Sequence, residues 1–277
     1  MAGPLVSAAW LTEHHADADL SLLDFRWYLD GRSGLAAYAA GHIPGAVFVD
    51  MASVTGRRTD AGRHPLPEPA DFQLAMRKAG VGRRSPVVVY DDQGGMTAAR
   101  LWFLLRFFGH GQVALLDGGL QAWPHELSRE PARVAPGDFE AEEPRAEWVL
   151  DYALMGSRPA GTVLVDARAP DRFSGETEPI DPRAGHIPGA RNAPWGGNLE
   201  RDGRFLPAER LRERFLALGA EGENTVNYCG SGVSACHNLL ALELAGIPGA
   251  RLYEGSWSDW SSRAEAPVET GHSPGSR

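Results

Sequence analysis

One of the two cysteines of the chain stands where nucleophilic chemistry is feasible. In the stretch TVNYCGSGVSACHNLLAL, residues 225–242, Cys229 follows an apolar run and precedes small residues and then a helical pattern. Small residues let the backbone curl around the sulfur, so that successive N–H groups and a helix start can face an anion. Such a cradle stabilises a thiolate, the reactive form of cysteine, and it equally stabilises a persulfide anion. The alternative is a buried structural cysteine.

The same sequence pattern occurs twice, and the repeat identifies the elements that position this cysteine. SLLDFRWYL at residues 21–29 resembles VLVDARAPD at 163–171, and GHIPGA occurs in both halves. The segment that holds the cysteine, residues 224–244, resembles residues 86–105, where Asp91 stands in the place of the thiol. LLDGGLQAW at residues 115–123 likewise resembles LYEGSWSDW at 252–260. Four such matches in the same order indicate a duplicated domain. The fold therefore does not need the thiol, and only the second half retains it.

Each half alternates short Val- and Leu-rich strands with helical segments. This alternation predicts an α/β fold with two similar domains, each a mainly parallel sheet flanked by helices. We predict a first domain over residues 1–135, a Pro- and Glu-rich linker over 136–147, a second domain over 148–270 and a tail over 271–277.

Composition and charge limit the classes of partner. Of the 277 residues, 43% are hydrophobic and 23% charged, and the formal net charge of −9 argues against nucleic acid or anionic membranes as partners. The sequence has no apolar run of about 18 residues, which a membrane span needs, and no secretory signal is recognised. With two cysteines and no disulfide framework, we expect a cytoplasmic protein. The spacing of Cys229 and Cys236 does not fit a zinc site, and we expect no metal.

In order and spacing, these motifs resemble the tandem-domain rhodanese-type sulfurtransferases. The likeness covers nearly all of the chain and rests on the paired GHIPGA segments, RFSGETEPIDPRAGHIPGA, the loop CGSGVSAC and GSWSDW. It implies two rhodanese-like domains, of which only the second carries sulfur, as a persulfide of Cys229, with no separate cofactor. The loop is similar to that of 3-mercaptopyruvate sulfurtransferases. Thiosulfate sulfurtransferases commonly show a charged CRKGVTA loop, and Gly230 and Ser231 stand where its basic pair would be.

The resemblance also implies roles in substrate binding and proton transfer. Arg172 in DRFSG matches the family's substrate-binding arginine, whose fork suits a 2-oxo acid carboxylate. Arg183 is the candidate for a second such arginine, with a surface arginine as the alternative. His64 in GRHPLP matches a first-domain histidine that the family places beside the cysteine loop, where it works with the loop serine, here Ser231. The candidates for an acidic partner of His64 are Asp50 and Asp60. The remaining predicted binding residues of the loop are Gly230, Gly232, Val233 and Ser234.

Several polar residues recur in both halves, and for these we expect structural roles. They are Arg26 and Arg168 of the Asp-x-Arg segments and His42 and His186 of the GHIPGA segments. Cys236 is expected to pack in the helix after the loop. A phosphatase with a rhodanese fold would need an arginine six positions after its cysteine to grip phosphate, and Ala235 stands there.

The sequence therefore predicts a sulfurtransferase. Its donor would be a small sulfur-containing anion, 3-mercaptopyruvate, and its acceptor a thiol, a thioredoxin-like protein or cyanide. One alternative is the same chemistry with thiosulfate as the donor. The other, from a different class, is a persulfide carrier that passes sulfur between proteins without turnover.

Overall fold

The computed structural model describes residues 3–58 and 60–272, and this part of the chain forms two compact units. Unit 1 comprises Met1–Thr55, Pro67–Arg145 and Arg201–Phe205, and unit 2 comprises Gly56–Leu66, Ala146–Glu200 and Leu206–Arg277. Relative to the predicted boundaries, two short segments, residues 56–66 and 201–205, belong to the other unit. The first of them carries His64, so this histidine is part of unit 2.

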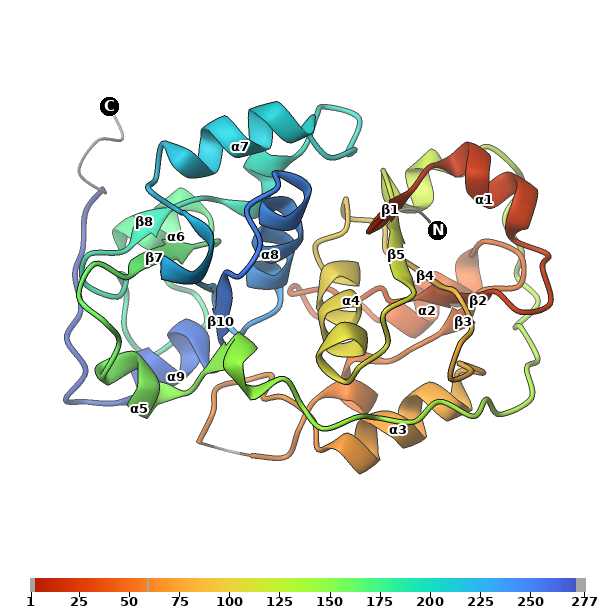
Figure 1. The fold of residues 1–277 in the computed structure, drawn as a ribbon, viewed down its shortest axis with the longest axis horizontal. Coiled ribbons are helices and arrows are strands. Elements are labelled where there is room, and N and C mark those ends of the chain that lie inside the picture. The colour runs from red at the N-terminus through yellow and green to blue at the C-terminus, as the bar shows by residue number, and fades with distance from the viewer. Residues whose placement is uncertain (1–2, 59, 273–277) are drawn as a thin grey trace. The chain divides into compact units, whose positions relative to one another are not determined.

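Unit 1 is a five-stranded sheet with helices on its faces (Figure 1). The strand order is β1-β5-β4-β2-β3, and every neighbouring pair is parallel. The strands are β1 (Leu5–Val6), β2 (Ser21–Asp24), β3 (Val47–Phe48), β4 (Val87–Tyr90) and β5 (Val113–Leu116). The helices are α1 (Ala8–His14), α2 (Gly34–Ala40), α3 (Pro69–Lys78) and α4 (Ala98–Phe107), with 3₁₀ turns η1 (Met51–Val54) and η2 (Gly119–Ala122).

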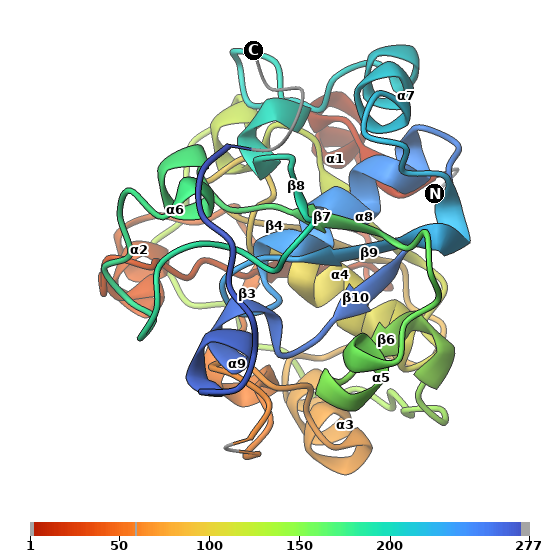
Figure 2. The same ribbon diagram turned by 90° about the vertical axis from the view of Figure 1, so that its left-hand side faces the viewer.

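Unit 2 repeats this architecture (Figure 2). Its parallel sheet has the order β6-β10-β9-β7-β8. The strands are β6 (Val149–Leu150), β7 (Val163–Asp166), β8 (Arg191–Asn192), β9 (Thr225–Tyr228) and β10 (Arg251–Tyr253). The helices are α5 (Tyr152–Gly156), α6 (Pro170–Ser174), α7 (Ala208–Leu216), α8 (Ser234–Leu244) and α9 (Ser256–Ser262), with 3₁₀ turns η3 (Ala146–Trp148), η4 (Trp195–Asn198) and η5 (Gly222–Asn224). The predicted fold class is confirmed.

The strand register of the two sheets shows which positions are equivalent. In unit 1, β2 and β4 pair Asp24 with Tyr90, and in unit 2, β7 and β9 pair Asp166 with Tyr228. The residue that follows the central strand is Asp91 in one unit and Cys229 in the other. The duplicated turns therefore occupy the same place in the two sheets.

The central strands are apolar because both faces of each sheet are covered. All four residues of β4 and all four of β9 are buried, as expected for a parallel sheet between two layers of helices. In unit 2, side chains from α5, α6 and α9, among them Phe173 and Trp257, form one core cluster with Val226 and Tyr228 of β9. No helix among residues 3–58 and 60–272 is long and apolar enough to cross a membrane.

The Asp-x-Arg pair at the end of β2 and β7 has the same structural role in both units. Arg26 Nη2 donates to the Asp24 carboxylate at 2.7 Å and to the carbonyl oxygen of Gly41 at 2.8 Å. The equivalent Arg168 Nη2 donates at 2.7 Å to Asp166 and at 2.7 Å to the matching glycine carbonyl of the second GHIPGA segment. Each arginine ties the GHIPGA segment to a strand end, and its predicted structural role is confirmed.

The two GHIPGA histidines are also structural. His42 and His186 are almost fully buried, with 0% and 2% of their surfaces exposed. Their Nδ1 atoms lie 2.9 Å from the carbonyl oxygen of Tyr38 and 2.8 Å from that of Phe173, respectively. Each imidazole also stacks on the ring of that aromatic residue. The symmetry of these contacts confirms the prediction that the histidines hold a turn.

Candidate active site

The cysteine loop is anchored at both sides to the start of α9. Cys229 follows β9 and is 2% exposed. Its N–H donates to Ser256 Oγ at 3.2 Å, and its carbonyl oxygen accepts from the N–H of Trp257 at 2.9 Å. The next carbonyl, that of Gly230, accepts from the N–H of Ser258 at 2.9 Å. The GSWSDW motif therefore fixes the backbone on which the thiol is carried.

Ser256 holds this anchor in an unfavourable backbone conformation. Its φ of 52° lies in the left-handed region, and no other non-glycine residue of the described chain has a positive φ. The equivalent residue of unit 1 is Gly119, with φ 61°. A side chain in this region costs about 1 kcal/mol or more, and such strain is typical of functional sites. Here the Ser256 hydroxyl accepts a hydrogen bond from the Cys229 N–H and donates one, at 3.0 Å, to the carbonyl oxygen of Tyr253.

Unit 1 shows what the turn can bind. Asp91, the counterpart of Cys229, is fully buried, and its carboxylate fills the turn. The donors, at 2.8–3.0 Å, are the N–H groups of Gln93, Gly95, Thr97 and Ala98 and the hydroxyl of Thr97. The equivalent Gly94 and Gly232 both have a positive φ, 66° and 77°, whereas the next residues differ, with φ 90° at Gly95 and −85° at Val233. The two turns therefore share the first part of the bend and diverge after it. The turn of unit 1 is therefore an anion cradle, and Cys229 is the residue that stands at the position of Asp91 in unit 2.

The rest of the loop leads into α8. Val233 is 3% exposed and Ser234 is the first residue of α8. The carbonyl of Val233 accepts from the N–H of Cys236 at 3.1 Å. Cys236 is fully buried in α8, and its Sγ donates to the carbonyl oxygen of Gly232 at 3.2 Å. As predicted, Cys236 packs in the helix after the loop.

His64 lies beside the loop serine. Its Nδ1 is 2.8 Å from Ser231 Oγ, and Ser231 is 6% exposed. The segment 56–66 lies against the start of α9, because a Cβ at Gly62 would be 2.4 Å from the carbonyl oxygen of Gly255. The structure thus joins the two residues proposed for proton transfer by a hydrogen bond.

The two acidic residues predicted as candidate partners of His64 make contacts with other residues. Asp50 is in unit 1, where its carboxylate caps η1 by accepting the N–H of Ala52 at 3.0 Å. Asp60 is exposed and pairs with Arg58 at 3.3 Å.

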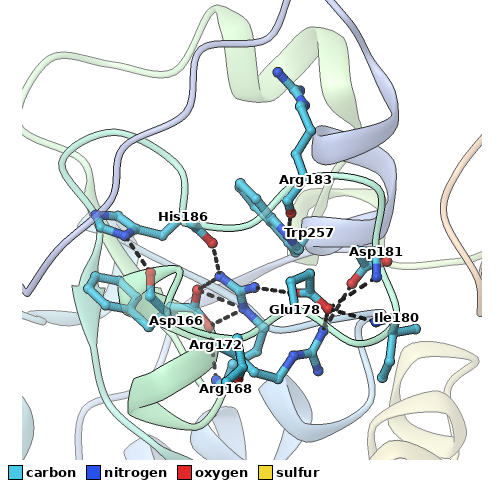
Figure 3. Close-up of polar contacts among 12 residues, drawn as sticks. Asp166, Arg168, Arg172, Glu178, Ile180, Asp181, Arg183, His186 and Trp257 are labelled. Atoms are coloured by element: carbon cyan, nitrogen blue, oxygen red, sulfur yellow. Dashed lines mark hydrogen bonds and ion pairs between the residues drawn. The ribbon is translucent and has the colours of Figure 1, made fainter.

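Arg172 and a second arginine, Arg63, flank the loop. A Cβ built on Gly230 would lie 2.9 Å from Arg63 Nη2 and 3.5 Å from Arg172 Nη1. Arg172 Nη2 donates to Glu178 at 2.7 Å and to Asp181 at 3.0 Å (Figure 3). The other carboxylate oxygen of Asp181 pairs with Arg63 Nη1. Arg63 is not among the site residues predicted from the sequence, although it directly precedes His64 in the GRHPLP motif.

Arg183 lies elsewhere. In Figure 3 its side chain extends away from Arg172, and its guanidinium meets the end of α9. The four acceptors, at 2.6–2.9 Å, are the carbonyl oxygens of Trp260, Ser261, Arg263 and Ala266. This placement gives Arg183 a structural task in closing α9, in place of the predicted substrate contact or a surface role.

Burial raises the pKa of the Asp181 carboxyl above its ordinary value, while the charge of Arg63 opposes that shift. A buried carboxylate of this kind needs cationic partners, and it has two. Among the described residues no cluster of three or more His, Cys, Asp or Glu side chains is arranged to hold a metal ion.

This fold and loop define a known class of protein. The family model of the rhodanese-like domain matches residues 7–126 and 151–263, and the chain belongs to this family. A protein of Pseudomonas aeruginosa that is provisionally named a 3-mercaptopyruvate sulfurtransferase is 47% identical over 96% of this chain and 98% of its own length. SseB of Mycobacterium tuberculosis, provisionally named a thiosulfate sulfurtransferase, is 42% identical over 96% of this chain and 97% of its own.

A solved structure has the same fold. The crystal structure of SseA from Escherichia coli, described as a 3-mercaptopyruvate sulfotransferase with the rhodanese fold, matches with a TM-score of 0.81 and 35% identity. The match covers 92% of this chain and 99% of SseA. The predicted family resemblance is therefore confirmed over nearly the whole chain.

Proposed function

We propose that the protein is a sulfurtransferase that moves sulfur from 3-mercaptopyruvate, through a persulfide of Cys229, to a thiol acceptor. The observation that carries the proposal is the cradle: the turn whose counterpart in unit 1 encloses the Asp91 carboxylate holds a thiol in unit 2. The names of the relatives from P. aeruginosa and E. coli support the donor.

The proposed half-reaction balances without an added oxidant or reductant. The Cys229 thiolate attacks the donor sulfur, an S–S bond forms, and the C–S bond breaks with its electron pair left on the methylene carbon of the pyruvate enolate. The proton of the donor thiol ends on that carbon. The products are pyruvate and a persulfide anion, which the amides of the turn would stabilise.

In this scheme the hydrogen-bonded pair of Ser231 and His64 carries the proton from sulfur to carbon. Arg172 binds the carboxylate of the donor, for which a guanidinium fork is suited. In the second half-reaction an acceptor thiolate attacks the outer sulfur and releases the Cys229 thiolate. We propose a small thiol, a thioredoxin-like protein or cyanide as the acceptor, no cofactor other than the persulfide, and a cytoplasmic location.

A comparison of donors tests the proposal. Purified protein is assayed with 3-mercaptopyruvate and with thiosulfate, with cyanide as the common acceptor, and intact mass is measured after each donor without acceptor. We expect a mass gain of one sulfur atom and a higher kcat/KM for 3-mercaptopyruvate. If neither donor gives a persulfide or turnover, the enzyme proposal fails. The alternative of a persulfide carrier that is loaded by one of these donors then fails as well.

Thiosulfate is the second candidate donor, because a specific observation favours it. The loop has no basic residue of its own, yet the guanidinium groups of Arg63 and Arg172 lie beside Gly230. Positive charge is thus present at the loop, supplied by other segments, and the name of SseB points to thiosulfate. A higher kcat/KM for thiosulfate in the same assay would establish this alternative.

The proton pair gives a further expected result. Because Ser231 and His64 act on one proton through one hydrogen bond, Ser231→Ala and His64→Gln should each lower kcat with 3-mercaptopyruvate by about 100-fold or more. The double variant should be no more than about threefold slower than the slower single variant. His272→Gln, a change at an exposed histidine of unit 2, is the control and should leave kcat unchanged. Losses that multiply in the double variant would show that the two residues act independently.

A further inference from the structure

Arg63 is the charged group at the cysteine loop that the proposed mechanism does not yet use. We propose that Arg63 is a donor-binding residue, which together with Arg172 holds the carboxylate of the donor between two guanidinium groups beside Gly230. This inference rests on the proposed function and adds to it a residue that determines which donors bind. It also supplies the second arginine that Arg183, engaged at the end of α9, does not provide.

The free donors of the two arginines converge on one place. Arg63 Nη2 and Arg172 Nη1 both lie within 3.5 Å of the point where a Cβ of Gly230 would stand. Asp181 takes Nη1 of Arg63 and Nη2 of Arg172, so the ion pairs occupy the other nitrogens of the two groups. One carboxylate placed beside Gly230 can therefore reach a guanidinium N–H with each of its oxygens.

The absence of a side chain at Gly230 keeps this place open. Any Cβ there would press on Arg63 Nη2 at 2.9 Å, which is closer than ordinary van der Waals contact. Because Gly230 follows Cys229 directly, a carboxylate held at this point lies one residue from the thiol that attacks the donor sulfur. A 2-oxo acid with sulfur on its third carbon is a short molecule. Its carboxylate could lie between the two arginines while its sulfur lies at the Cys229 thiol.

Asp181 positions the two arginines relative to each other. Its side chain is 3% exposed, whereas 29% of the Arg63 side chain and 12% of the Arg172 side chain are exposed. The buried carboxylate thus joins two partly exposed cations, and Glu178 binds Arg172 from the same side at 2.7 Å. Two guanidinium groups would repel each other at this separation without such a carboxylate.

The ion pairs of the two arginines continue to the end of strand β7. Glu178 also lies 3.3 Å from Arg168 Nη1, and Arg168 pairs with Asp166 at 2.7 Å (Figure 3). The charges alternate in sign from β7 to the loop, in the order Asp166, Arg168, Glu178, Arg172, Asp181 and Arg63. Arg63 is the most exposed residue of this series, and an added anion loses the least hydration there.

Steady-state kinetics and direct binding test the inference. Because Arg63 would bind the carboxylate equally in the ground state and the transition state, Arg63→Gln should raise KM for 3-mercaptopyruvate by about 10- to 100-fold and change kcat little. Arg63→Lys retains a cation for Asp181 but lacks the planar fork, so its KM should also rise, by about tenfold or less. Arg58→Gln, in the same segment but paired with Glu254 at 3.2 Å, is the matched control and should leave KM within about twofold.

Pyruvate binding separates this inference from the proposed function. The affinity of pyruvate for the Cys229→Ser protein, measured by calorimetry, needs no sulfur transfer, and Arg63→Gln in that background should weaken it by about 10-fold or more. If wild-type protein fails to turn over while pyruvate binding still depends on Arg63, the proposed function fails and the binding role stands. If both Arg63 variants keep KM and pyruvate affinity within about twofold of the parent proteins, the inference is wrong. Circular dichroism confirms that each variant is folded.

Discussion

Cys229→Ser is expected to abolish sulfur transfer and the mass gain of one sulfur atom with either donor. A serine hydroxyl is far less acidic and less nucleophilic than a thiol, and it forms no persulfide. The backbone of the loop should persist, because its anchors run through the N–H and carbonyl of residue 229 to Ser256 and Trp257. Loss of activity would therefore report the missing sulfur atom.

Cys236→Ser is the matched control for this result. Cys236 is the other cysteine of the chain, it is fully buried in α8, and its Sγ donates to the carbonyl of Gly232, as a serine hydroxyl can also do. This variant should keep the persulfide and most of the turnover. If Cys229→Ser still gained one sulfur atom and Cys236→Ser did not, the assignment of the nucleophile would be reversed.

Much of the fold could be predicted because the duplication is visible in the residues. Alternating apolar strands and helical segments gave the α/β class, and the matched positions Asp91 and Cys229 fall at equivalent places in the two sheets. The structural tasks of His42 and His186 followed from their symmetry. Polar residues that occur in both halves support the sheet, so comparing the two halves is enough to predict their structural role.

The residues that were missed are those that differ between the halves or come from outside the repeat. Ser256 stands where the first half has Gly119, and only the structure shows its φ of 52° and its bond to the Cys229 N–H. Arg63 comes from a segment far from the loop in sequence, so no spacing rule could place it beside Gly230. Arg183 is an arginine close in sequence to Arg172, as a second carboxylate-binding residue was expected to be. Its side chain instead points to the carbonyl oxygens at the end of α9, which the sequence does not reveal.

The turn after the central strand has a structural role in unit 1 and a different residue, a cysteine, in unit 2. In unit 1 the amides are satisfied by a carboxylate that belongs to the chain, and this closes the turn. In unit 2 a cysteine stands at that position, and its surroundings differ from those of unit 1: Ser256 accepts its N–H, Ser231 contacts His64, and two arginines lie beside Gly230. The fold thus supplies the same turn twice, with a carboxylate in one unit and a thiol in the other.

Asp91 should be a determinant of the stability of unit 1, because its buried carboxylate is the acceptor for the whole turn. Asp91→Ala removes the acceptor of five hydrogen bonds in a buried turn and leaves their donors unpaired. The free energy of unfolding of unit 1 should fall by about 3 kcal/mol or more. Asp91→Asn should lose nearly as much, because its amide NH₂ group would face N–H donors. Asp30→Ala, a change at a carboxylate that is 58% exposed beside Arg32, is the control and should leave the free energy of unfolding almost unchanged.

Hydrogen exchange with mass spectrometry, read over peptides of β4 and α4 and compared with peptides of β9 and α8, assigns the loss to one unit. We expect exchange in the Asp91 variants to accelerate in β4 and α4 more than in β9 and α8. Because the cradle of unit 2 has its own anchors at Ser256 and Trp257, it should keep its protection, and the Cys229 persulfide should still form. Equal protection of β4 in the Asp91→Ala and Asp30→Ala proteins would show that the turn does not depend on its anion. In that case the structure of unit 1 would no longer support the interpretation of the cysteine loop as an anion cradle.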